Sequence, residues 1–134
     1  MSVGRLQQIE QLQQIEQLLL NLLPADVAVR ETESWLLGDR HGFAAFAAVA
    51  LNKIPQEPEA LQDPKETLIG LVRRSRKRRL IQEIVPAHGS PVAIGPLYNE
   101  RLVAFAEQSW DIDAASGACP SLSRMRQRLA GFLI

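Results

Sequence analysis

The residues of this chain that could take part in chemistry are few and scattered. His41 and His88 are the only histidines, and Cys119 is the only cysteine. A zinc site needs three or four such ligands close together, and neither histidine has a second histidine or a cysteine near it in the sequence. We therefore expect no metal site, and we expect both histidines to have a structural or surface role.

Two short pairs have the residue types of catalytic sites. Ser90 lies beside His88, but a serine–histidine dyad also needs an orienting third group and an oxyanion hole, and the sequence marks neither. Asp111 and Asp113 flank Ile112, so their carboxylates diverge in a helix and share a side only in an extended segment. No glycine-rich phosphate loop is present. These observations predict that the protein is not an enzyme and holds no cofactor.

The strongest local signal is a run of basic residues. Six of the seven side chains from residue 73 to residue 79 are basic, namely Arg73, Arg74, Arg76, Lys77, Arg78 and Arg79. Such a run suits nucleic-acid phosphates, where each cation displaces counterions. The chain is neutral overall, however, and no aromatic residues are interleaved for base stacking. Three interpretations stay open: a protein-binding patch, which we favour, a solvated helix end, and a nucleic-acid contact.

Charge follows the chain in blocks of alternating sign. The net charge is −5 over residues 1–63, +6 over residues 64–79, −4 over residues 80–113 and +3 from residue 114 onward. Blocks of this size give one molecular surface patches of both signs. Complementary charge would then steer and register a contact with a partner, while buried apolar residues would hold it.

Length and composition indicate one globular domain spanning residues 1–134. Hydrophobic residues make up 46% of the chain and aromatic residues 5%, so we expect an aliphatic core. Cys119 is expected to be a small buried hydrophobe in a reducing compartment. The apolar stretch near the N-terminus is short and follows a Gln/Glu-rich segment. That pattern matches neither a signal peptide nor a membrane span, and it predicts a cytoplasmic protein.

The first predicted helix covers about residues 5–23. The segment QQIEQL at residues 7–12 is repeated at once, and its apolar residues, among them Ile9, Leu12 and Ile15, recur every three positions. Since each residue turns a helix by 100°, this row drifts by about 60° per step and winds around the helix. One neighbouring helix is too narrow to cover such a stripe. We expect it to pack under several helices or to drive self-association into a dimer or larger assembly.

Helical spacing and helix breakers predict the remaining elements, and strand patterns are weak. The last helix is expected to be capped by Ser121. Residues 86–96 and 111–117 are expected to be a loop and a connector. The predicted fold is all-α, a compact bundle of six or seven helices. After the first, a helix is expected to open at residues 24–26 and to end at Gly38 or near Gly42. Asp63 is expected to cap the helix that runs from Pro64 to a turn near Ser75–Arg78. The others are expected at about Phe43–Ile54, Leu80–Val85, Leu97–Ala106 and Leu122–Leu133.

Four stretches form a pattern beyond their separate helices: LLLNLLP at residues 18–24, LIGLV at 68–72, RRLIQEI at 78–84 and GSP at 89–91. This pattern resembles the effector-associated, death-like domains of bacteria, which typically read LLxLFP, LIxW, RGRLxELIxxA and NPxN. The resemblance covers roughly residues 12–97 and leaves residues 98–134 as a C-terminal helical extension. The chain departs from the pattern at Arg73 or Arg74, where the family has Trp, and at Lys77 or Arg78, where it has Gly.

The resemblance implies a small death-like helical bundle that acts as an adaptor, in which a copy on a sensor binds a like copy on an effector. The sequence therefore favours a non-enzymatic protein–protein interaction module in a bacterial defence or signalling system. Its expected partner is a like-folded helical domain, with a homo-oligomer as one form of the contact. Acidic and basic faces on one molecule suit such heterologous contacts. The alternative is a small helical nucleic-acid-binding regulator that uses residues 73–79.

Overall fold

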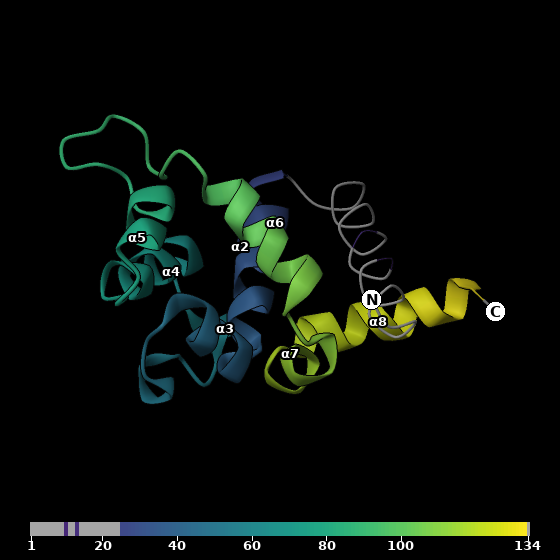
Figure 1. Cartoon of the computed structure of the whole chain (residues 1–134). Coiled ribbons are helices and arrows are strands. Elements are labelled where there is room, and N and C mark those ends of the chain that lie inside the picture. Colours follow the sequence, from purple (N-terminus) through teal and green to yellow (C-terminus); the bar gives the residue numbers. More distant parts are fainter. Residues whose placement is uncertain (1–9, 11–12, 14–24, 134) are drawn as a thin grey trace.

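The structure, a computed structural model, describes Glu10, Gln13 and residues 25–133. In these residues the chain forms helices and no strand, which confirms the all-α prediction (Figure 1). The helical elements slightly exceed the six or seven expected. They are α2 (Ala25–Gly38), α3 (Arg40–Ala47), the 3-10 helices η1 (Leu51–Lys53) and η2 (Pro58–Ala60), α4 (Pro64–Arg73), α5 (Arg78–Ile84), α6 (Tyr98–Gln108), α7 (Ile112–Ala118) and α8 (Pro120–Leu133).

Helix α2 is the central element of the fold. It packs against α3, α4, α7 and η2, while α5 packs between α4 and α6. Trp35 and Leu37 of α2 are fully buried, and so is Trp110 after α6, whose indole donates a hydrogen bond of 3.0 Å to the Trp35 carbonyl oxygen. The core is otherwise largely aliphatic, as the low aromatic content predicts. Both tryptophans nevertheless lie in it and tie α2 to the α6–α7 junction.

Several local predictions are confirmed. The Asp63 carboxylate accepts a hydrogen bond of 3.0 Å from the Glu66 amide, and Pro64 occupies the first turn of α4. This is the expected N-terminal cap, in which a short acidic side chain satisfies a free helix amide. The chain also turns between α4 and α5, as expected, and it runs as a loop over residues 86–96 that extends from the body of the molecule (Figure 1).

The predicted helix from Phe43 to Ile54 is wrong in its second half. Helix α3 ends at Ala47, because Ala48 adopts a left-handed conformation with φ of 54°. The Arg40 guanidinium then donates to the Ile54 carbonyl oxygen at 3.1 Å and to that of Leu51 at 3.4 Å. These bonds hold η1 back against the start of α3, a long-range contact that helical spacing does not reveal.

Two predictions near the C-terminus also require correction. Residues 111–117 are not a connector, because residues 112–117 form most of α7 (Ile112–Ala118). The Asp111 carboxylate caps this helix by accepting from the amides of Asp113 and Ala114 at 2.9 and 3.2 Å. Ile112 and Ala115 are buried beneath this short helix. Ser121 does not cap α8 from outside, because the helix begins one residue earlier, at Pro120.

The predicted first helix falls mostly outside the described residues. Of it, Glu10 and Gln13 are described, and both are helical and exposed. The apolar stripe at Ile9, Leu12 and Ile15 lies outside the described residues, so its expected role stays a prediction. In the part of the chain that is described, no helix combines the length and the apolar character needed to cross a membrane.

Candidate interaction surface

The residues that could do chemistry do not converge in the structure. His41, His88 and Ser90 are all exposed, and the Ser90 hydroxyl accepts a hydrogen bond of 3.2 Å from the Val92 amide rather than contacting His88. The Asp113 carboxylate forms an ion pair of 3.0 Å with Arg126. Over the described ranges, no three histidine, cysteine or acidic residues gather in a way that could hold a metal ion. The Ser90 and Asp113 side chains thus make local structural contacts.

Cys119 is fully buried, as the sequence predicts. Its thiol lies 3.5 Å from the Ser34 carbonyl oxygen, where α2 faces the end of α7. A Cβ atom on Gly38 would approach the Cys119 sulfur to 2.7 Å. The glycine therefore allows α2 and the α7–α8 junction to pack closely, and the thiol has a packing role.

Glu33 and Tyr98 form a buried polar pair between α2 and α6. The tyrosine hydroxyl donates a short hydrogen bond to the Glu33 carboxylate. Burial raises the pKa of Glu33 above its ordinary value of 4.5, although the bond from Tyr98 and the charge of Lys65 act in the opposite direction. Burial also raises the pKa of Tyr98, and the neighbouring carboxylate adds to that effect. The pair therefore joins α2 to α6.

Asp39 is a second buried acid with a structural role. Its carboxylate accepts a hydrogen bond of 3.1 Å from the Gly42 amide at the start of α3. The other oxygen accepts from the Asp111 amide, at 2.9 Å, beside the start of α7. One buried side chain thus satisfies backbone groups at the beginnings of two helices.

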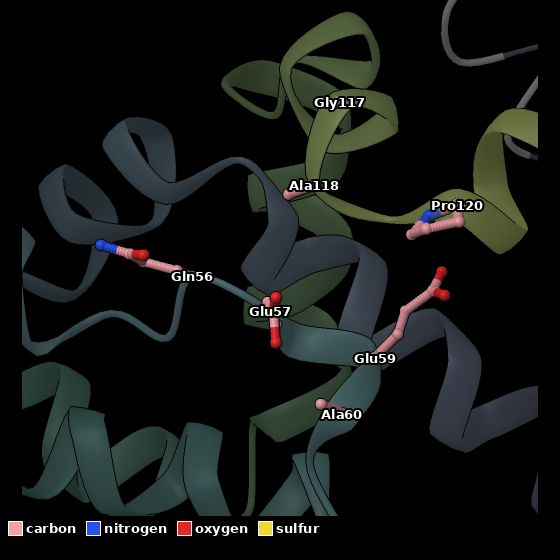
Figure 2. A pocket seen from close by; sticks show the side chains of 7 residues that line it. All are labelled: Gln56, Glu57, Glu59, Ala60, Gly117, Ala118 and Pro120. Carbon is pink, nitrogen blue, oxygen red and sulfur yellow. The ribbon is translucent and has the colours of Figure 1, made fainter.

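An open hollow of about 600 Å³ lies between η2 and the α7–α8 junction (Figure 2). In Figure 2 the Glu59 side chain extends toward Pro120 at the start of α8. Its carboxylate accepts from the Ser121 amide at 2.9 Å and also from the Ser121 hydroxyl, which itself accepts from the Trp35 indole at 2.9 Å. Glu59 therefore caps α8 from a distant segment, and this replaces the predicted Ser121 cap.

The basic run covers the last residue of α4, a well-anchored turn at residues 74–77 and the first two residues of α5, and we call it the basic turn (residues 73–79). On either side of it, Leu71, Val72 and Leu80 are buried in the core. Within it, the Lys77 amide donates to the Ser75 hydroxyl at 2.9 Å, and the Lys77 ammonium donates to the Phe46 carbonyl oxygen, at 3.3 Å, near the end of α3. These bonds fix the backbone while the basic side chains stay exposed.

Few counterions within the described residues neutralise the basic turn. The Arg79 guanidinium lies 3.0 Å from the Glu83 carboxylate, yet the arginine side chain is 90% exposed. Glu83 is shared, because Arg101 of α6 lies 2.7 Å from its other oxygen. No ion pair between described residues involves Arg73, Arg74, Arg76 or Arg78. The turn therefore presents a concentrated positive charge to solvent.

The position of this charge is unfavourable for the helix that follows. Helix α5 begins at Arg78 with no side-chain cap on Lys77 and no acidic residue in its first turn. A helix N-terminus carries a partial positive charge, so a cation there typically costs about 0.3–1 kcal/mol. At the other end of the turn, Arg73 lies in the last turn of α4, where the helix dipole favours a cation. Local stability alone explains Arg73 but not Arg78.

The sequence reading missed a second surface, the outward side of α6. The buried side of this helix is formed by Tyr98, Leu102, Phe105 and Ala106. Residues 100, 103 and 107 lie on the opposite side and are exposed, so two glutamates flank a valine there. The spacing of these residues is visible in the sequence, but only relative to a known buried side.

Comparison with known proteins gives no relative: no family model, no curated protein and no solved structure matches this chain.

Proposed function

We propose that this protein is a non-enzymatic interaction module, an adaptor whose basic turn binds an acidic surface on a helical protein partner. The observation that carries the proposal is an exposed and anchored cluster of cations with few internal counterions. Ions of one sign held close together repel one another, and an acidic partner relieves that repulsion. Charge complementarity of this kind raises association rates and fixes the register of a contact.

The energetic cost at the start of α5 supports the same proposal. An acidic residue at position 78 would make α5 more stable, but the chain carries an arginine there. A partner carboxylate placed against the turn supplies the missing negative charge only in the complex. The anchoring by Lys77 and the flanking core residues keeps the turn ordered, so that little ordering entropy opposes binding.

Nucleic acid is the alternative ligand for the same cations. Binding to single strands draws much of its affinity from bases stacked on exposed aromatic rings. Among the described aromatic residues, Phe46 is half-buried and the others are buried: Trp35, Phe43, Tyr98, Phe105 and Trp110. The turn therefore offers phosphate contacts without a stacking platform, which favours a protein partner over a single-stranded nucleic acid.

The proposal includes the identity suggested by the sequence resemblance. A death-like arrangement of the helices, a cytoplasmic location and a place in a bacterial defence or signalling system are consistent with an adaptor of this size. The apolar stripe at Ile9, Leu12 and Ile15 remains a second predicted contact surface. The same partner can use both surfaces, because charges orient a complex while buried apolar residues hold it together.

Partner capture with matched variants tests the proposal. The bait is the full chain, either wild type or with Arg74, Arg76 and Arg78 changed to Glu, which keeps the Lys77 anchor, and the lysate is treated with nuclease. The control bait carries Arg124→Glu and Arg128→Glu, which reverse exposed charges on α8 instead. We expect a protein partner that binds the wild type and the control but not the turn variant.

Two outcomes oppose the proposal. If every bait retains the same proteins, the basic turn has no role in partner binding. If the wild type instead binds generic DNA or RNA, with an affinity that falls steeply on a log–log plot against salt, the nucleic-acid alternative replaces it.

A further inference from the structure

The exposed large hydrophobic residues of the described chain are confined to one short region. They are Val92, Leu97 and Val103, with exposed fractions of 58%, 41% and 53%. Leu97 and Val103 belong to the start and the outward side of α6. Single exposed apolar residues need no explanation, but Val103 lies midway along the outward side of α6, between two exposed glutamates.

The same face of α6 is acidic. Glu100 and Glu107 are seven residues apart, so both project from one side of the helix at a separation of about 10 Å along its axis. Val103 lies between them. The basic residue at the edge of this face, Arg101, is held by Glu83 of α5. The outward side of α6 therefore combines two carboxylates with an apolar centre.

The basic turn has the complementary properties. Its arginines extend from a short turn, so that neighbouring guanidinium groups can reach both carboxylates. Their aliphatic stems can cover an exposed valine while the charged groups stay at the rim. Both surfaces are carried by helices that pack together, since α5 contacts α6 and Arg79 is linked to Arg101 through Glu83. One chain thus presents both halves of a contact on neighbouring elements.

We propose that the outward side of α6, with Glu100, Val103 and Glu107, is the docking site for the basic turn of a second copy of this chain. This inference rests on the proposed function, because it names the partner of the basic turn. It adds the acidic half of the contact, which the sequence reading did not find. It also accounts for the exposed valine, which the copy's arginine stems cover.

Charge reversal followed by mixing tests the inference with full chains in analytical ultracentrifugation at low salt. The turn variant carries Arg74→Glu, Arg76→Glu and Arg78→Glu, which leaves the Lys77 anchor in place, and the face variant carries Glu100→Lys and Glu107→Lys. We expect the wild type to self-associate and each variant alone to do so at least about tenfold more weakly, because like charges then face one another. We expect an equimolar mixture of the two variants to associate again.

Recovery in the mixture also shows that both variants are folded, so that a loss of assembly in either one has a clear meaning. The matched controls are Glu57→Lys, at an exposed acid away from α6, and Arg124→Glu with Arg128→Glu on α8. Both controls should associate as the wild type does.

Three results overturn the inference. A wild type that stays monomeric at high micromolar concentration removes the second copy as the partner. Unchanged assembly of the face variant removes α6 as the docking site. Absence of recovery on mixing removes the pairing of the two surfaces. Capture of a different protein by the basic turn, alongside a monomeric wild type, leaves the proposed function standing while this inference fails.

Discussion

Reversing the charge of Arg78 should separate the stability of this protein from its binding. Arg78 is the first residue of α5, a helix without a side-chain cap and without an acid in its first turn. Changing it to Glu removes an unfavourable interaction with the helix dipole and adds a favourable one, each about 0.3–1 kcal/mol. We therefore expect the Arg78→Glu variant to be more stable by about 1 kcal/mol, and its Tm to rise by about 3–5 °C.

The same change should weaken binding, because it places a negative charge in the basic turn opposite an acidic partner. We expect the affinity for the partner to fall at least about tenfold. Thermal unfolding and urea unfolding measure the stability, and a binding titration with the captured partner or a second copy measures the affinity. A gain in stability with a loss of binding indicates that Arg78 is present for the contact.

Arg73→Glu is the matched control, because it makes the same charge change in the same turn. Arg73 lies in the last turn of α4, where the dipole favours a cation, so this variant should be less stable by about 0.5–1 kcal/mol. Its binding should fall as that of Arg78→Glu does. If the two variants change stability in the same direction, the helix-dipole reasoning is refuted. If Arg78→Glu keeps full binding, the role of this residue in the contact is refuted.

Three further predictions concern the interior. Burial raises the pKa of Glu33 above 4.5, so the folded state keeps a proton that the unfolded state releases. The free energy of unfolding should therefore fall as pH rises above about 4.5. Urea unfolding across this range should show a smaller fall for Glu33→Gln. Asp39→Ala leaves two helix-start amides without their acceptor and should cost about 2–4 kcal/mol in urea unfolding, against about 1 kcal/mol for the exposed cap variant Asp63→Ala. Cys119 should react with a thiol reagent only as the protein unfolds, and fast labelling of the native protein would contradict this packing. Gly38→Ala should lower the free energy of unfolding, and adding Cys119→Ala should partly restore it.

The parts of the fold that were predictable from sequence are those fixed by neighbouring residues. Asp63 and Pro64 mark the start of α4 because a cap and its first turn lie within four residues. The break between α4 and α5 was visible because a run of six cations has no place on a buried helix face. The exposure of the basic turn follows from the same physical reason.

The features that were missed depend on contacts between distant segments. Helix α7 forms because Ile112 and Ala115 pack against α2 and the Asp111 carboxylate caps it, although Asp113, Ser116 and Gly117 within it are weak helix formers. Helix α3 ends where the backbone of Ala48 adopts the left-handed conformation, and no neighbouring residue in the sequence indicates this. The acidic side of α6 became visible only when its buried side was known.

The central claim is that the basic turn is the surface by which this protein binds another protein. Amide hydrogen exchange, with the captured partner or at a concentration where copies associate, measures this most directly. We expect slower exchange in peptides covering residues 73–79 on complex formation, and no change in peptides from α8. Slower exchange that excludes residues 73–79 and appears elsewhere would contradict the claim.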